Sequence, residues 1–158
     1  MKTAPGTLLL AAALLSLGAV ATALVTQHVF GMQPCPWCVL QRLIFVAIGA
    51  AALLTWLLRW RSTRRVGAVG VLLLAGCGVA AALWQHYVAA ASASCNLTLA
   101  DRIVNGLGLD GLWPEVFAAY ASCADAAVQL AGLPYEFYSL ALFVVLGAIG
   151  ALVLRRPQ

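Results

Sequence analysis

Two cysteines three positions apart, Cys35 and Cys38, are the residues of this chain best suited to chemistry. A C-x-x-C spacing holds two sulfur atoms close enough to cycle between a dithiol and a disulfide. Pro36 suits the first position of a helix, so we expect Cys35 to cap a helix and Cys38 to lie in its first turn. Unpaired backbone N–H groups and the helix dipole favour a thiolate there. Arg42 follows on the same helical face and places a cation beside that thiolate, although it could also snorkel to the membrane interface.

Three further cysteines lie later in the chain. Cys95 and Cys123 are widely separated within one long segment, and we interpret Cys77, inside an apolar run, as a small buried hydrophobic residue. The alternatives to redox chemistry are two structural disulfides or a zinc site. Zinc sites usually draw on closely spaced pairs, of which there is only one here, so we expect no metal. Arg42 argues against purely structural disulfides, because these have no use for a nearby cation.

The elements that must position these cysteines belong to a membrane protein. Of the 158 residues, 64% are apolar and only 9% are charged, whereas a soluble domain carries roughly 25% charged residues. So much apolar surface excludes disorder, and the net charge of +4 forms no basic face for nucleic acid. Polar residues at mid-membrane depth, which a channel or transporter needs, are almost absent.

Four apolar stretches are long enough to cross the hydrocarbon core, which takes about 20 helical residues. Such runs satisfy their backbone groups in lipid as helices. The sequence therefore predicts an all-α integral membrane protein, with residues 1–158 forming a single domain. It is a four-transmembrane-helix bundle with a long outer loop between the third and fourth helices. The predicted spans are 7–26, 39–58, 66–85 and 133–154.

The basic residues predict the orientation of the bundle. Of nine Lys and Arg residues, one is at position 2, four lie in the 59–65 turn and two are at 155–156. The positive-inside rule places both termini and that turn in the cytoplasm. Segments 29–37 and 87–132 then face outward, where disulfides persist. Lys2 and the following apolar run also resemble a signal peptide, but the run exceeds the usual length of about 7–15 residues, so we expect a retained helix.

The run C-P-W-C-V-L-Q-R, from Cys35 to Arg42, resembles the redox motif of the bacterial DsbB family, disulfide bond formation protein B. The W-Q-H sequence ending at His86 and the loop over 112–134 also match, and so does the order of the two cysteine pairs. The resemblance covers about residues 30–143. The Pro-Trp dipeptide between the first two cysteines and the additional Cys77 are departures from the family pattern.

The resemblance implies a membrane thiol:quinone oxidoreductase of the bacterial inner membrane, with its redox loops in the periplasm. A thioredoxin-fold partner like DsbA would bring two electrons as a dithiol and attack a Cys95–Cys123 disulfide, at Cys95. Cys123 would then attack Cys35, and Cys38 would leave as a thiolate.

The resemblance also implies that Cys38 passes the electrons to a membrane quinone, either ubiquinone or menaquinone. Arg42 would stabilise the thiolate and the negative charge that develops on the quinone oxygen. Gln85 or His86 could donate a hydrogen bond to a quinone carbonyl; the alternative is that they are interfacial polar residues at a helix end.

Pro114, at a suitable first helical position, predicts a short helix over 114–121 on the membrane surface. We expect it to tether the loop so that Cys123 can reach Cys35. The alternative is that this segment packs against the helix ends.

Overall fold

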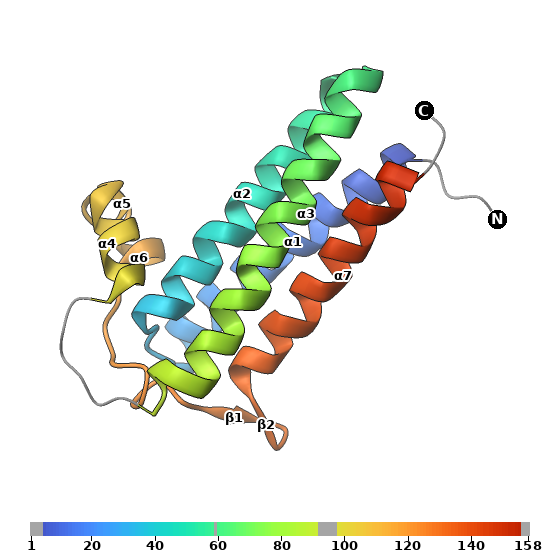
Figure 1. Cartoon of the computed structure of the whole chain (residues 1–158). Helices are drawn as coiled ribbons and strands as arrows, with labels where there is room; N and C mark the ends of the chain where they lie inside the picture. Colours follow the sequence, from blue (N-terminus) through green and yellow to red (C-terminus); the bar gives the residue numbers. More distant parts are fainter. Residues whose placement is uncertain (1–4, 59, 92–97, 156–158) are drawn as a thin grey trace.

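The computed structural model describes residues 5–58, 60–91 and 98–155 and shows a bundle of long helices (Figure 1). By length and hydropathy, four helical spans among these described residues are able to cross a membrane. The spans are formed by α1 (Pro5–Phe30), α2 (Pro36–Leu58), α3 (Arg61–Trp84) continued by the π-helical turn η1 (Gln85–Ala89), and α7 (Tyr135–Arg155). The chain is therefore an all-α membrane protein of the predicted class.

Three of the helices begin earlier than the apolar pattern predicts. α1 begins at Pro5, α2 at Pro36 and α3 at Arg61. At α2 the cause is local, because proline fits the first helical position and the Cys38 backbone N–H donates to Cys35 Sγ at 3.3 Å, capping the helix. At α3 the helix continues through its arginines, since a helix need not end where its apolar run ends.

A β-hairpin delays the start of α7 relative to its predicted span. Strands β1 (Gln129–Leu130) and β2 (Leu133–Pro134) pair antiparallel. The two residues between them, Ala131 and Gly132, have φ values of 51° and 82°. Positive φ at both positions is the geometry of a tight two-residue hairpin turn. Leu133 and Pro134 therefore lead into α7 as a strand.

Small residues allow α3 and α7 to approach each other closely, as is usual in membrane bundles. A Cβ atom at Gly78 of α3 would overlap the ring of Phe143 of α7. Phe143 is fully buried and stacks on Phe45 of α2, with ring centroids 4.0 Å apart and planes 5° from parallel. These three residues connect the packing of α2, α3 and α7 in the core.

Residues 99–117 fold beside α2 as α4 (Leu99–Gly106), α5 (Leu109–Leu112) and α6 (Pro114–Phe117) (Figure 1). The predicted helix over 114–121 is wrong in length, because α6 ends at Phe117. The chain turns extended at Ala118, and the backbone N–H groups of Tyr120 and Ala121 donate to the carbonyl of Pro34. Phe117 is buried against Val39 of α2 and Val104 of α4.

Candidate active site

Three sulfur atoms meet at one end of the bundle, the cysteine end, which holds Cys35, Gln85 and Tyr135. Cys35 Sγ lies 2.6 Å from Cys38 Sγ and also hydrogen-bonds to Cys123. Both Cys35 and Cys123 are buried. The order of contacts is therefore Cys123, Cys35, Cys38. Cys95, the other loop cysteine of the predicted site, lies outside the described residues.

Cys77 is not buried, and its interpretation as a core residue is wrong. It lies on an exposed face of α3. A small thiol is compatible with lipid as well as with a protein core, so its place in an apolar run did not reveal which face it occupies.

Hydrogen bonding between Cys35 and Cys123 shifts the pKa values of these two thiols in opposite directions. The bond from Cys35 lowers the pKa of Cys123, and the Trp37 backbone N–H acts in the same direction, while burial opposes both. Hydrogen bonding to Cys123 and to Cys38, together with burial, raises the pKa of Cys35. In the reduced protein the proton therefore stays on Cys35 and the thiolate is favoured at Cys123.

Two buried glutamines form a hydrogen-bonded chain that ends at Cys38. Gln41 Nε2 donates to Gln85 Oε1 at 2.7 Å, and Gln85 Nε2 donates to Cys38 Sγ at 3.4 Å. Gln85 opens the π-helical turn η1, a feature that occurs frequently at functional sites. An amide N–H aimed at sulfur stabilises negative charge there. Sequence reasoning gave Gln41 no role of its own, although it stands inside the motif.

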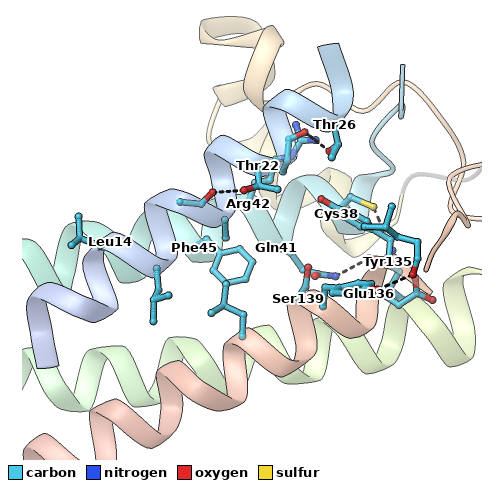
Figure 2. Close-up of a pocket in the computed structure, with 18 residues that line it drawn as sticks. Leu14, Thr22, Thr26, Cys38, Gln41, Arg42, Phe45, Tyr135, Glu136 and Ser139 are labelled. Carbon is cyan, nitrogen blue, oxygen red and sulfur yellow. Dashed lines mark hydrogen bonds between the residues drawn. The ribbon is translucent and has the colours of Figure 1, made fainter. Parts of the chain in front are cut away.

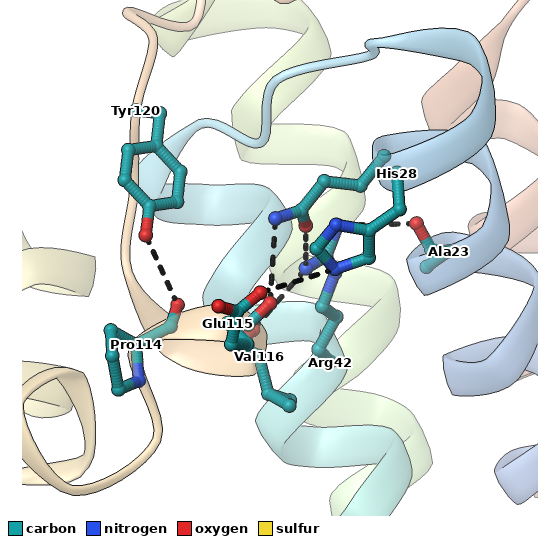
Figure 3. Close-up of polar contacts among 8 residues, drawn as sticks. Ala23, His28, Arg42, Pro114, Glu115, Val116 and Tyr120 are labelled. Atoms are coloured by element: carbon teal, nitrogen blue, oxygen red, sulfur yellow. Dashed lines mark hydrogen bonds and ion pairs between the residues drawn. The ribbon is translucent and has the colours of Figure 1, made fainter.

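Arg42 is buried, with 6% of its surface exposed, and its hydrogen bonds run to two other elements (Figure 3). Nη1 donates to Gln27 Oε1 at 2.6 Å and to the Val116 carbonyl at 3.2 Å, while Nη2 donates to the Ala23 carbonyl at 3.5 Å. Among the described residues these acceptors are all neutral. The cation is therefore held rigidly, and no described carboxylate cancels its charge.

The same contacts fasten α6 to the bundle. Gln27 Nε2 donates to the Glu115 carbonyl at 3.3 Å. The Glu115 carboxylate lies 3.6 Å from His28 Nε2, but both side chains are largely exposed, so this pair adds little. Gln27, which sequence reasoning missed, thus connects the cation to the loop that carries Cys123.

A cavity of about 440 Å³ lies between α1, α2 and α7 and includes Cys38 in its lining (Figure 2). Its volume falls within the range of about 300–1,000 Å³ for small-molecule sites. Leu14 and Tyr138 line it and are also exposed on the outside of the bundle. The cavity therefore reaches the outer surface. Its polar lining residues are Thr22, Thr26, Cys38, Gln41, Arg42, Gln85, Tyr135, Glu136, Tyr138 and Ser139.

The structure places the two predicted quinone-binding residues of η1 differently. Gln85 lines the cavity, whereas the ring of His86 lies outside the lining. His86 Nδ1 is instead 2.7 Å from Glu136 Oε1, and Glu136 does line the cavity. Sequence reasoning gave Glu136 no role. The signal that could have identified it is a carboxylate in the first turn of a membrane helix.

Comparison with known proteins then identifies the family. The model of the family described as disulfide bond formation protein DsbB matches residues 5–153. The chain belongs to the DsbB family. Its relatives named disulfide bond formation protein B include one from Herminiimonas arsenicoxydans, 37% identical over 87% of each chain. One from Ralstonia nicotianae is 34% identical over 85% of this chain and 84% of the relative, and one from Dechloromonas aromatica is 32% identical over 90% and 87%.

Membership of the DsbB family agrees with the resemblance read from the sequence and makes the chain a bacterial membrane protein of disulfide bond formation. Disulfide bond formation implies thiol–disulfide oxidoreductase activity and a partner with which disulfides are exchanged. In this DsbB relative, the sulfurs of Cys35, Cys38 and Cys123 are the atoms in contact that could carry such an exchange.

Proposed function

We propose that the chain is a thiol:quinone oxidoreductase of the bacterial inner membrane, which reoxidises a periplasmic DsbA-like protein. One observation carries the proposal: Cys35 contacts Cys123 on one side and Cys38 on the other, and Cys38 lines the cavity. This arrangement connects the loop that carries Cys123 to a cavity that a lipid-soluble acceptor can enter.

The exchange begins when a partner thiolate attacks Cys95 of a Cys95–Cys123 disulfide, a step that rests on the family resemblance. The partner's second thiol then closes the partner's own disulfide and frees Cys95. The Cys123 thiolate attacks Cys35 of a Cys35–Cys38 disulfide, and Cys38 leaves as a thiolate. Cys95 finally displaces Cys35 from Cys123, which restores the loop disulfide. Two electrons have then moved from the partner to Cys35 and Cys38.

The cavity residues fit a quinone, either ubiquinone or menaquinone. When bound, the quinone accepts the two electrons. Arg42 presents a buried positive charge that no described carboxylate neutralises, suited to a Cys38 thiolate and to charge developing on a carbonyl oxygen. Gln85 donates to Cys38 and also lines the cavity, so its amide holds the sulfur at the cavity wall. His86 lies outside the cavity lining and is linked to the cavity by its contact with Glu136.

The proposed orientation places the cysteine end in the periplasm and both termini in the cytoplasm. In support, the basic first turn of α3 and the final turn of α7 with Arg155 lie at the other end of the bundle from the first turn of α2 (Figure 1). Basic residues at membrane ends favour the cytoplasmic side.

The test is thiol-dependent quinone reduction by the purified full chain in detergent, with a reduced DsbA-like protein as donor and ubiquinone or menaquinone analogues as acceptors. We expect the wild type to turn over and Cys38→Ser to abolish turnover. Cys77→Ser is the matched control, because Cys77 lies on an exposed face of α3, and it should retain wild-type rates. A wild type that reduces neither quinone would refute the proposal and leave the cysteines as structural disulfides.

A further inference from the structure

One ionisable pair in the membrane-spanning part of the chain has no place in the exchange of disulfides. Glu136, in the first turn of α7, has only 7% of its side chain exposed, and its Oε1 lies 2.7 Å from Nδ1 of His86 on η1. Holding a carboxyl group out of water in a membrane helix costs free energy, and ionisable residues at such positions commonly mark functional sites. The question is therefore what this pair does at the wall of the cavity.

The pair joins the cavity to the outside of the bundle. Glu136 lines the cavity at the same end as Cys38, with Leu14 at the other end (Figure 2). His86 lies behind Glu136 and has 31% of its side chain exposed. Its ring is held edge-on by Tyr87 and Phe137, with centroids 4.9 Å and 4.7 Å away. A proton taken up by His86 can thus reach Glu136 through a single hydrogen bond.

Proton balance gives such a route a purpose. When the Cys35 thiol and the Cys38 thiolate form a disulfide, two electrons and one proton are released. Reducing a quinone to a quinol takes up two electrons and two protons. One proton is therefore missing at the cavity, because Cys38 leaves its disulfide as a thiolate and carries no proton.

We infer that Glu136 is the acid that supplies this proton to the bound quinone, and that His86 reprotonates Glu136 from the cysteine end of the bundle. The inference rests on the proposed function. Glu136 gives up its proton to a quinone oxygen, and the carboxylate then takes a proton from His86, which recovers one from solvent. A histidine next to a carboxylate is a common arrangement for general acid catalysis near neutral pH.

The other ionisable groups of the cavity are poorer donors. Arg42 does not release its proton in proteins. Cys38 is the electron donor. Tyr135 and Tyr138 line the cavity from α7, but a phenol is a weaker acid than a carboxyl group, and the Tyr138 hydroxyl already donates to the Leu130 carbonyl at 2.7 Å. From η1, Tyr87 contacts the His86 ring and is not part of the cavity lining.

The test compares the wild type with Glu136→Gln, and Asp110→Asn serves as a control that removes a carboxylate of α5 outside the cavity lining. Steady-state rates with a soluble ubiquinone analogue are measured across pH, quinone affinity is measured by tryptophan fluorescence, and electron transfer from the reduced partner to Cys35–Cys38 is measured without quinone. We expect Glu136→Gln to lower kcat about 100-fold, in the range of general acid catalysis. Quinone affinity should stay within about threefold of wild type, and quinone-free exchange should be unchanged.

The pH profile separates proton supply from a structural role. The wild-type rate should fall as pH rises, because the pair loses its transferable proton, whereas Glu136→Gln should lose this dependence. His86→Gln should flatten the profile in the same way and serves as the second variant if Glu136→Gln does not fold. The inference is overturned if the variants keep wild-type kcat and profile, or if they lose quinone-free exchange as well. A wild type that exchanges disulfides but reduces no quinone overturns both the inference and the proposed function.

Discussion

Adding one methyl group at Gly78 should disturb the cavity from the far side of the core. A Cβ atom there overlaps the ring of Phe143, which is fully buried and stacked on Phe45. The Phe143 ring cannot move away without displacing Phe45, and Phe45 lines the cavity. Overpacking of this kind costs about 1–3 kcal/mol.

Gly76→Ala, on the same helix, is the matched control, because a Cβ atom at Gly76 would meet no other atom within 4 Å. Both substitutions gain about 1 kcal/mol of helix propensity, so this contribution cancels when the two variants are compared. We therefore expect Gly78→Ala to have a free energy of unfolding about 1–3 kcal/mol below that of Gly76→Ala, measured by denaturation in mixed detergent micelles.

The same pair of variants tests the connection to the cavity. Displacement of Phe45 should raise the KM for quinone about tenfold in Gly78→Ala, which corresponds to about 1.4 kcal/mol, and leave it unchanged in Gly76→Ala. Equal stability and equal KM in the two variants would refute the reasoning, since the overlap with Phe143 would then be relieved without effect on the core or the cavity.

Arg42→Lys should raise the KM for quinone about tenfold in the steady-state assay. The reason is that an ammonium group cannot reproduce the contacts of the planar guanidinium with Gln27 and Val116. An unchanged KM would show that a positive charge alone suffices for quinone binding. Gln27→Leu should lower the free energy of unfolding by about 2 kcal/mol, as expected for a lost hydrogen bond to a charged group. It should also speed hydrogen exchange in α6, because Gln27 bonds the Glu115 carbonyl. Unchanged exchange would contradict the role of Gln27 in connecting Arg42 to α6. In the reduced protein, Cys123 should be alkylated by iodoacetamide well below pH 8.5, because its lowered pKa keeps thiolate present there. Cys35→Ala should move that pH profile upward, and an unmoved profile would show that Cys35 does not set the pKa.

The bundle could be predicted from the sequence because each long apolar run meets the length needed to cross lipid. The start of α2 was also predictable, since the proline after Cys35 and the helix cap act over a few residues. The later start of α7 was not predictable from hydropathy. It depends on the pairing of Gln129 and Leu130 with Leu133 and Pro134 across a turn, which the average hydropathy of the segment does not reveal.

Contacts between helices were harder to predict than the helices themselves. The pairing of Gln27 with Arg42 depends on how α1 and α2 are rotated against each other, which no single segment specifies. The roles of Gln85 and His86 depend on the π-helical turn, whose i→i+5 bonding changes the direction of successive side chains relative to an α-helix. An α-helical projection therefore does not show that Gln85 faces Cys38 while His86 faces α7.

The cysteine end of the bundle holds Cys35, Cys38, His86 and Glu136 together, and this determines whether the reaction moves charge across the membrane. In the proposed reaction, the protons released when the thiols are oxidised and the protons taken up by the quinone leave and enter at the same face of the membrane. No charge then crosses the bilayer, where each elementary charge would exchange about 2.3 kcal/mol with every 100 mV of potential. We expect oxidation of the partner in sealed vesicles to be electroneutral and its rate to be unaffected by an imposed membrane potential.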